Sequence, residues 1–200
     1  MPKQCYNLNR PFHLGRRDVF YETAVSTMRL SMEESSARRL RQRLDLVLYC
    51  LHSALEHGSL AHQAQRAPAE EKPFLQFLEM LLARLQAGRL MLLTSRQWAR
   101  DNSPVRQFLA CQAPAAEVPA SALQTSVPDI FRDALAFVRS AAEPLRNLQT
   151  ACVGKLPSED RARYEKAAAS LRSHLAATAD HPRPRTFVQS AYPVLETTDG

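Results

Sequence analysis

The stretch SMEESSARRLRQRLDLVLYCLHSALEHG, residues 31–58, decides the fold class. Its apolar residues recur at steps of three and four, the spacing that places side chains on one face of a helix. They are Leu40, Leu44, Val47, Leu48, Leu51 and Leu55. Ser31 and Glu34 match a capping box, and Gly58 suits a helix end. The pattern predicts an amphipathic helix over about 32–57.

A second helix is predicted directly after a polar connection, over about 71–87. Pro73 suits its first turn and Gly88 suits its C-terminal cap. Its apolar stripe again follows the helical spacing and consists of Phe74, Phe77, Leu78, Leu81, Leu82 and Leu85. A short helix is expected to begin at Pro104.

Two further helices are predicted in the last third of the chain. One covers about 128–154, with Ser126 as a candidate N-cap and with Pro144 expected to kink or interrupt it. The other covers about 158–178, and its small residues Ala167–Ala169 allow another helix to approach closely. Adjacent amphipathic helices of this kind pack as antiparallel hairpins.

Three segments favour strands instead. Residues 19–30 alternate with a period of two, although a helix beginning at Asp18 is the alternative. Residues 89–95 form a short apolar run that fits either a buried strand or a continuation of the preceding helix, and residues 184–195 are extended in character. The expected fold class is therefore mainly α, with four or five amphipathic helices, and an α+β fold with a small sheet from 19–30, 89–95 and 184–195 is the alternative.

The chain has 200 residues, of which 45% are apolar, enough for one hydrophobic core. We expect an irregular basic arm over 1–18 and a single helical domain over 19–178. That domain contains an Ala/Pro-rich loop at 112–127, and an extended or flexible tail follows at 179–200.

Positive charge is concentrated near the N-terminus. The net charge is +6, and residues 1–43 hold nine Lys or Arg against four Asp or Glu. Such a region suits the binding of phosphates or of an acidic protein. The alternative is a solvent-exposed helix face on which glutamates balance the arginine charges. Aromatic residues between arginines also suit nucleic acid or a protein partner, although Trp98 equally suits a core anchor. The candidate binding residues are Arg16, Arg17, Arg38, Arg39, Arg41, Arg43, Arg96, Trp98 and Arg100.

No catalytic or cofactor motif is present in the sequence. The five glycines are isolated, which argues against a phosphate-binding loop, and the four cysteines lack metal-ligand spacing. No cofactor or metal is expected. A hidden active site around Cys50, His52 and His57 is the enzyme hypothesis, against a packing thiol and surface histidines.

The sequence contains no apolar run of membrane-spanning length and no signal-peptide pattern. We therefore expect a cytoplasmic protein, or one located in the host cytosol if it is viral or a secreted effector. With 22 Arg against four Lys, the source is expected to be a GC-rich bacterium, mobile element or virus. The leading hypothesis is a non-enzymatic helical interaction or adaptor protein that binds a protein partner or self-associates through apolar helix faces. The alternative is a nucleic-acid-associated accessory protein or nucleoprotein that uses the basic N-terminal third.

Overall fold

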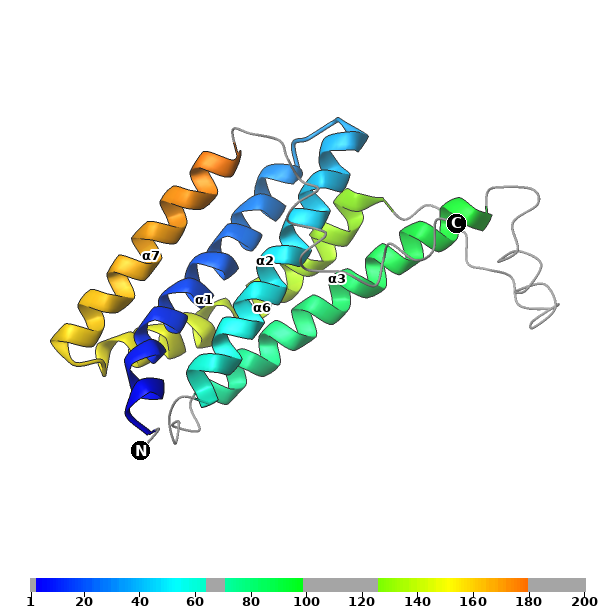
Figure 1. The fold of residues 1–200 in the computed structure, drawn as a ribbon. Helices are drawn as coiled ribbons and strands as arrows, with labels where there is room; N and C mark the ends of the chain where they lie inside the picture. Colours follow the sequence, from blue (N-terminus) through cyan, green and yellow to red (C-terminus); the bar gives the residue numbers. More distant parts are fainter. Residues whose placement is uncertain (1–2, 64–70, 99–125, 180–200) are drawn as a thin grey trace.

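The computed structural model describes residues 3–63, 71–98 and 126–179, and these residues form five α-helices and no strand (Figure 1). The helices are α1 (Lys3–Ser31), α2 (Ala37–Gln63), α3 (Lys72–Trp98), α6 (Val127–Gly154) and α7 (Ser158–Ala179). The prediction of a mainly α fold is confirmed.

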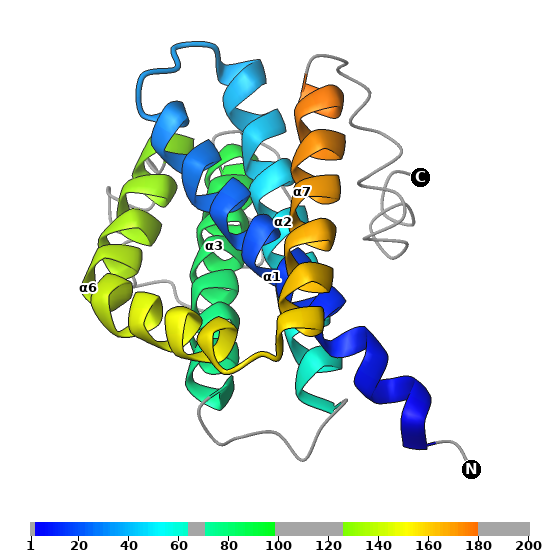
Figure 2. The same cartoon turned by 90° about the vertical axis from the view of Figure 1, so that its left-hand side faces the viewer.

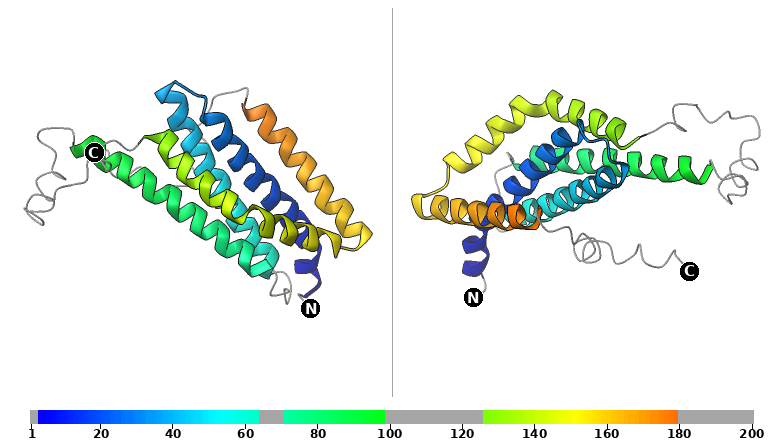
Figure 3. Two further views of the ribbon diagram at one scale, coloured as in Figure 1. Left: turned by 180° about the vertical axis from the view of Figure 1, so that it is seen from behind. Right: turned by 90° about the horizontal axis from the view of Figure 1, so that it is seen from above.

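Successive helices run in opposite directions (Figures 1 and 3), and the pairs α1–α2, α2–α3 and α3–α6 pack as antiparallel hairpins, whereas α7 follows α6 in the chain but packs mainly against α1. Helix α1 is central and contacts α2, α7 and α6, whereas α3 packs against α2 and α6. Figure 1 shows α7, α1 and α2 side by side, with α6 crossing behind them. One face of α1 therefore lies toward the core, and the helices α7 and α2 flank it.

The predicted apolar stripes form the core. The α2 stripe from Leu40 to Leu51 is buried, and so is every member of the α3 stripe from Phe74 to Leu85. Helix α6 contributes Ile130, Phe131 and Val138 among others. Burial of each large side chain contributes about 1.5–3 kcal/mol, which is why these stripes determine the packing.

The strand interpretation is wrong for two of the three segments, and in both the helical alternative is correct. Residues 19–30 belong to α1 and residues 89–95 belong to α3. The α1 residues that are buried include Tyr21, Ala24 and Met28, whose spacing is that of a helix face. The period-two alternation of this segment does not reflect a strand, because packing of its helical face against α2 determines the local structure. Residues 184–195 and the helix expected at Pro104 lie outside the described residues.

The expected irregular arm at 1–18 is instead helical from Lys3 onward. Leu14 is fully buried and continues the buried face of α1 toward the N-terminus, so packing extends the helix through this polar segment. Pro11 lies inside the helix, where it removes one backbone hydrogen bond. Figure 2 shows the first turns of α1 projecting away from the bundle. The predicted loop at 112–127 lies outside the described residues except for its last two positions, and the predicted tail lies outside them from residue 180 onward.

The predicted limits of the two middle helices also need correction. Ser31 is the last residue of α1 and its hydroxyl donates to the Thr27 carbonyl oxygen (2.7 Å), so it does not cap α2. Gly58 and Gly88 lie inside α2 and α3 instead of ending them. They occupy places where helices touch, because an added Cβ would lie 2.6 Å from a Leu75 methyl at Gly58 and 2.8 Å from Ile130 at Gly88.

Two predictions about α6 are confirmed. Ser126 caps the helix with a reciprocal capping box to Asp129. Pro144 lies within a continuous helix, and Figure 2 shows that α6 bends in this part, as the missing hydrogen bond of a proline requires.

Helices α1 and α7 approach closely at Gly15. A Cβ at this position would lie 2.5 Å from the Tyr164 carbonyl oxygen and 3.4 Å from the Ala167 Cβ. Ala167 and Ala168 are buried at this contact, which confirms the prediction that the small residues of this segment admit a neighbouring helix.

Candidate interaction surface

The predicted binding residues do not form one surface. Arg38, Arg39, Arg41 and Arg43 lie together at the start of α2, and Arg16 lies half-buried on the N-terminal half of α1. Arg17 is buried in the core, with 2% of its surface exposed. The backbone of residues 96–98 belongs to α3, but the side chains of Arg96 and Trp98 lie outside the described part, as does all of Arg100.

The first group surrounds the turn between α1 and α2. Leu30 is 68% exposed at the end of α1 and Met32 is 36% exposed in the turn. We call this surface the arginine corner, and its members are Arg29, Leu30, Met32, Arg38, Arg39, Arg41 and Arg43. The Arg43 guanidinium donates to the Leu30 carbonyl oxygen (3.0 Å), which ties the start of α2 to the end of α1.

One carboxylate holds the arginine corner together. Glu34 lies 3.5 Å from the Arg43 guanidinium and 3.8 Å from that of Arg39, and it accepts from the Ser36 backbone N–H (2.9 Å). The Ser36 hydrogen bond, assisted by the two arginine charges, lowers the pKa of Glu34. Arg38 and Arg41, both exposed, have no ion pair in the described part of the chain. Their charges are therefore available to a ligand.

Arg16 belongs to a second, separate group on the face between α1 and α2. Its guanidinium carbon lies 5.3 Å from the Phe12 ring centroid and 5.8 Å from that of Phe20. Beside it, the Nδ1 atoms of His13 and His57 are 2.8 Å apart, and the His57 ring stacks on Phe20. The sequence placed Arg16 among aromatic residues, but it did not reveal that His57 comes from α2 to join them.

Arg17 forms part of a buried polar network that the sequence did not predict. Its guanidinium pairs with Asp18 (2.8 Å) and lies 4.4 Å from the centroid of the Phe74 ring. Asp18 also accepts from the Tyr164 hydroxyl (2.7 Å) and from the Gln149 amide (3.3 Å), so one carboxylate joins α1, α6 and α7. Burial and the Asp18 carboxylate raise the pKa of Tyr164, so the phenol stays protonated and donates.

A second buried ion pair lies at the same end of the bundle. Arg10 donates to Glu71, which immediately precedes α3, and both residues are buried. Together the two pairs place two cations and two carboxylates in the interior, so the net buried charge is zero. The available signal was the helical spacing of Arg10 and Arg17 with Leu14 and Tyr21, which places both arginines in an apolar stripe.

The side chains of the enzyme hypothesis point to different partners. Cys50 is fully buried, and burial raises the pKa of its thiol to about 12, so the thiol is protonated at neutral pH. His52 lies 3.1 Å from the Gln86 amide nitrogen of α3, whereas His57 faces His13. The burial and protonation of the thiol are therefore the observations against this hypothesis.

Helix α3 also exposes apolar side chains, namely Met80 (54%), Leu90 (65%) and Met91 (46%). The last two adjoin a part of the chain outside the described residues, so they carry no argument for a partner.

Within the described ranges, no helix is long and apolar enough to cross a membrane, and no group of three or more His, Cys, Asp or Glu side chains is suited to holding a metal ion. The chain matches no model of a known protein family, and neither a curated protein nor a solved structure is significantly similar to it.

Proposed function

We propose that this chain is a non-enzymatic helical interaction protein that binds an acidic, partly apolar segment of a partner protein at the arginine corner. The observation that carries the proposal is the exposure of Leu30 (68%) at a turn followed by arginines, of which Arg38 and Arg41 make no ion pair with any described residue. An exposed apolar side chain beside positive charge is a pattern of protein-binding surfaces, in which an apolar anchor is buried and charged residues select the partner, and the hydrogen bond from Arg43 to the Leu30 carbonyl places one such charge here.

A protein partner suits the arginine corner better than nucleic acid does. Residues 29–43 carry five arginines and two carboxylates, Glu33 and Glu34, so charge favours any anionic ligand and the apolar residues must decide between the two classes. Leu30 and Met32 gain little from a phosphate backbone, whereas an apolar side chain of a partner would bury them. Nucleic-acid binding through the same arginines is therefore the alternative outcome of the test.

The test uses a fluorescent helical peptide with one glutamate face and one leucine face, and a single-stranded DNA oligonucleotide of similar charge. Fluorescence anisotropy measures the binding of each probe to the wild type, to Leu30→Ser, and to the double variant Arg38→Gln and Arg41→Gln. The double variant Arg139→Gln and Arg146→Gln on α6 is the matched control, since it removes the same charge from another exposed surface.

We expect Leu30→Ser to weaken peptide binding roughly 5- to 30-fold, because burying most of a leucine is worth about 1–2 kcal/mol. The corner double variant should weaken it several-fold, and the α6 control should not. If Leu30→Ser leaves peptide binding unchanged while the oligonucleotide binds in a salt-sensitive way, the surface binds nucleic acid instead. If the α6 control loses as much affinity as the corner variant, binding is non-specific and the proposal is wrong.

A further inference from the structure

Arg16 is a half-buried cation that makes no ion pair with any described residue, although the Glu56 carboxylate acts on the neighbouring His13. Among the described residues it makes no ion pair and no hydrogen bond, and its Nε is buried without a partner. Its guanidinium carbon lies over the Phe12 and Phe20 rings, at 5.3 and 5.8 Å from their centroids. A cation–π contact offsets part of the lost solvation, but it leaves the hydrogen-bond donors of a guanidinium unused.

Two neutral histidines lie next to this cation. Their Nδ1 atoms, 2.8 Å apart, share one hydrogen bond, so one imidazole donates while the other accepts. Burial, the Arg16 charge and the neighbouring His13 lower the pKa of His57 to about 4. Burial and Arg16 also lower the pKa of His13, against the opposing effect of the Glu56 carboxylate.

We propose that Arg16, His13 and His57 form a binding site for an oxyanion, a phosphate or carboxylate group, whose binding is coupled to protonation of the histidine pair. An anion there would pair with the unused donors of Arg16, as guanidinium groups commonly do with phosphate and carboxylate. It would also supply the negative charge that lets one imidazole take a proton from solvent and become a second donor.

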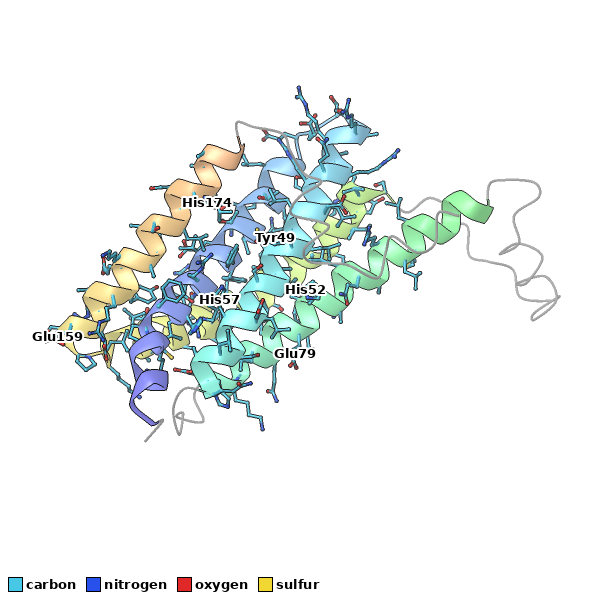
Figure 4. The ribbon with its side chains drawn as sticks, viewed as in Figure 1. Tyr49, His52, His57, Glu79, Glu159 and His174 are labelled. Atoms are coloured by element: carbon cyan, nitrogen blue, oxygen red, sulfur yellow. The ribbon has the colours of Figure 1, made fainter. Side chains whose placement is uncertain are left out.

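The site is open to solvent. Phe12 is 38% exposed, and the three polar residues are only partly buried. Figure 4 shows His57 on the same side of the molecule as Tyr49, on the part of α2 that borders α1. A metal ion is a poor occupant, because the Arg16 charge repels a cation and the described residues offer no third ligand.

The site lies apart from the arginine corner. Thirteen residues of α1 separate Arg16 from Arg29, which corresponds to roughly 20 Å along a helix. The inference therefore goes beyond the proposed function, and its failure would leave that function untouched.

The experiment follows the side-chain NMR signals of the histidines while sodium sulfate is added at constant ionic strength. Sulfate keeps its charge across the pH range used, so a change of affinity with pH reports on the protein. Phosphate and succinate are then titrated at neutral pH to distinguish the two kinds of ligand group. The variants are Arg16→Gln and His57→Gln, and Arg139→Gln is the control for charge.

We expect sulfate to shift the signals of both histidines in the wild type and in Arg139→Gln, and not in Arg16→Gln. Affinity should increase up to about tenfold for each pH unit below neutrality, the limit for uptake of one proton, and His57→Gln should lose most of this dependence. Binding of phosphate alone or of succinate alone identifies the ligand group and supports the site. Unshifted histidine signals in the wild type, or equal shifts in Arg16→Gln, would overturn the proposal.

Discussion

The buried carboxylate of Asp18 offers a direct test of how the bundle is held together. It pairs with Arg17 (2.8 Å) and accepts from Tyr164 (2.7 Å), and both Arg17 and Asp18 are 2% exposed. The substitution Asp18→Asn keeps the shape of the side chain but removes its charge, leaving the Arg17 cation buried without compensation. Breaking a buried ion pair in this way costs about 3–5 kcal/mol, a range that includes the weakened bond from Tyr164.

The chain provides a matched control between the same two helices. Glu22 of α1 and Arg172 of α7 pair at 3.1 Å, but their side chains are 53% and 56% exposed. Because solvent screens such a pair, Glu22→Gln should cost only about 0.2–1 kcal/mol. For a protein of this size each kcal/mol lowers the melting temperature by roughly 2–4 °C. Asp18→Asn should therefore melt about 6–20 °C below the wild type, and Glu22→Gln at most a few degrees below it.

Urea and thermal unfolding, monitored by circular dichroism, measure both variants. The double variant Arg17→Met with Asp18→Asn removes both charges, and we expect it to recover part of the stability that Asp18→Asn loses. If Asp18→Asn costs no more than Glu22→Gln, the network does not contribute as described. The same network means that a binding test should leave Arg17 in place, because its loss would destabilise the bundle as well as remove a charge.

Three further predictions concern packing, pH and thiol reactivity. Gly15→Val should destabilise the protein by about 1–3 kcal/mol in urea unfolding, because the added Cβ meets the Tyr164 carbonyl oxygen at 2.5 Å. The control Gly154→Ala, with nothing within 4 Å of the added Cβ, should be neutral or slightly stabilising. Equal effects of the two substitutions would contradict the close approach of α1 and α7. His57 has a pKa of about 4 in the folded protein against its usual 6.5, so the unfolded chain binds the proton first and stability should fall as the pH drops from 6.5 toward 4. His57→Gln should reduce the change in the free energy of unfolding between pH 6.5 and pH 4, and an unchanged pH dependence would contradict the lowered pKa of His57. Cys50, buried with its pKa raised to about 12, should resist alkylation in the native state by mass spectrometry and react on unfolding; rapid native labelling would contradict its burial.

The sequence predicted the helices wherever the apolar residues repeat without interruption. The stripes of α2 and α3 are buried as expected, apart from the partly buried Leu55, and the Ser126 cap is present. Prediction failed where two periods fit one segment. Residues 19–30 satisfy both a strand and a helix pattern, and only the packing of α1 against α2, α7 and α6 selects the helix.

The second kind of error concerns glycine, which is common both at helix ends and at places where two helices pack closely. Gly58 and Gly88 were assigned to helix ends, where glycine is common. In the structure both lie inside helices, at contacts where an added Cβ would force a side chain of another helix to shift. Nothing local in the sequence separates these roles, since the neighbour that forbids the Cβ, Leu75 or Ile130, comes from another helix.

The positive charge of the first 43 residues shows the limit of counting charges along a sequence. Arg10 and Arg17 are neutralised inside the bundle by Glu71 and Asp18, so they contribute nothing at the surface. The other arginines of this segment are Arg16 and those of the arginine corner, and these two sites lie roughly 20 Å apart along α1.

This separation makes the two proposals independent of each other. Charges at such a distance are largely screened at physiological salt, where the Debye length is about 8 Å. Arg16→Gln should therefore leave peptide binding unchanged, and the double variant of Arg38 and Arg41 should leave sulfate binding unchanged. If each variant impaired both kinds of binding, a single extended surface would have to cover the outer face of α1 and α2, and the ligand would have to be long enough to reach from one end of that face to the other.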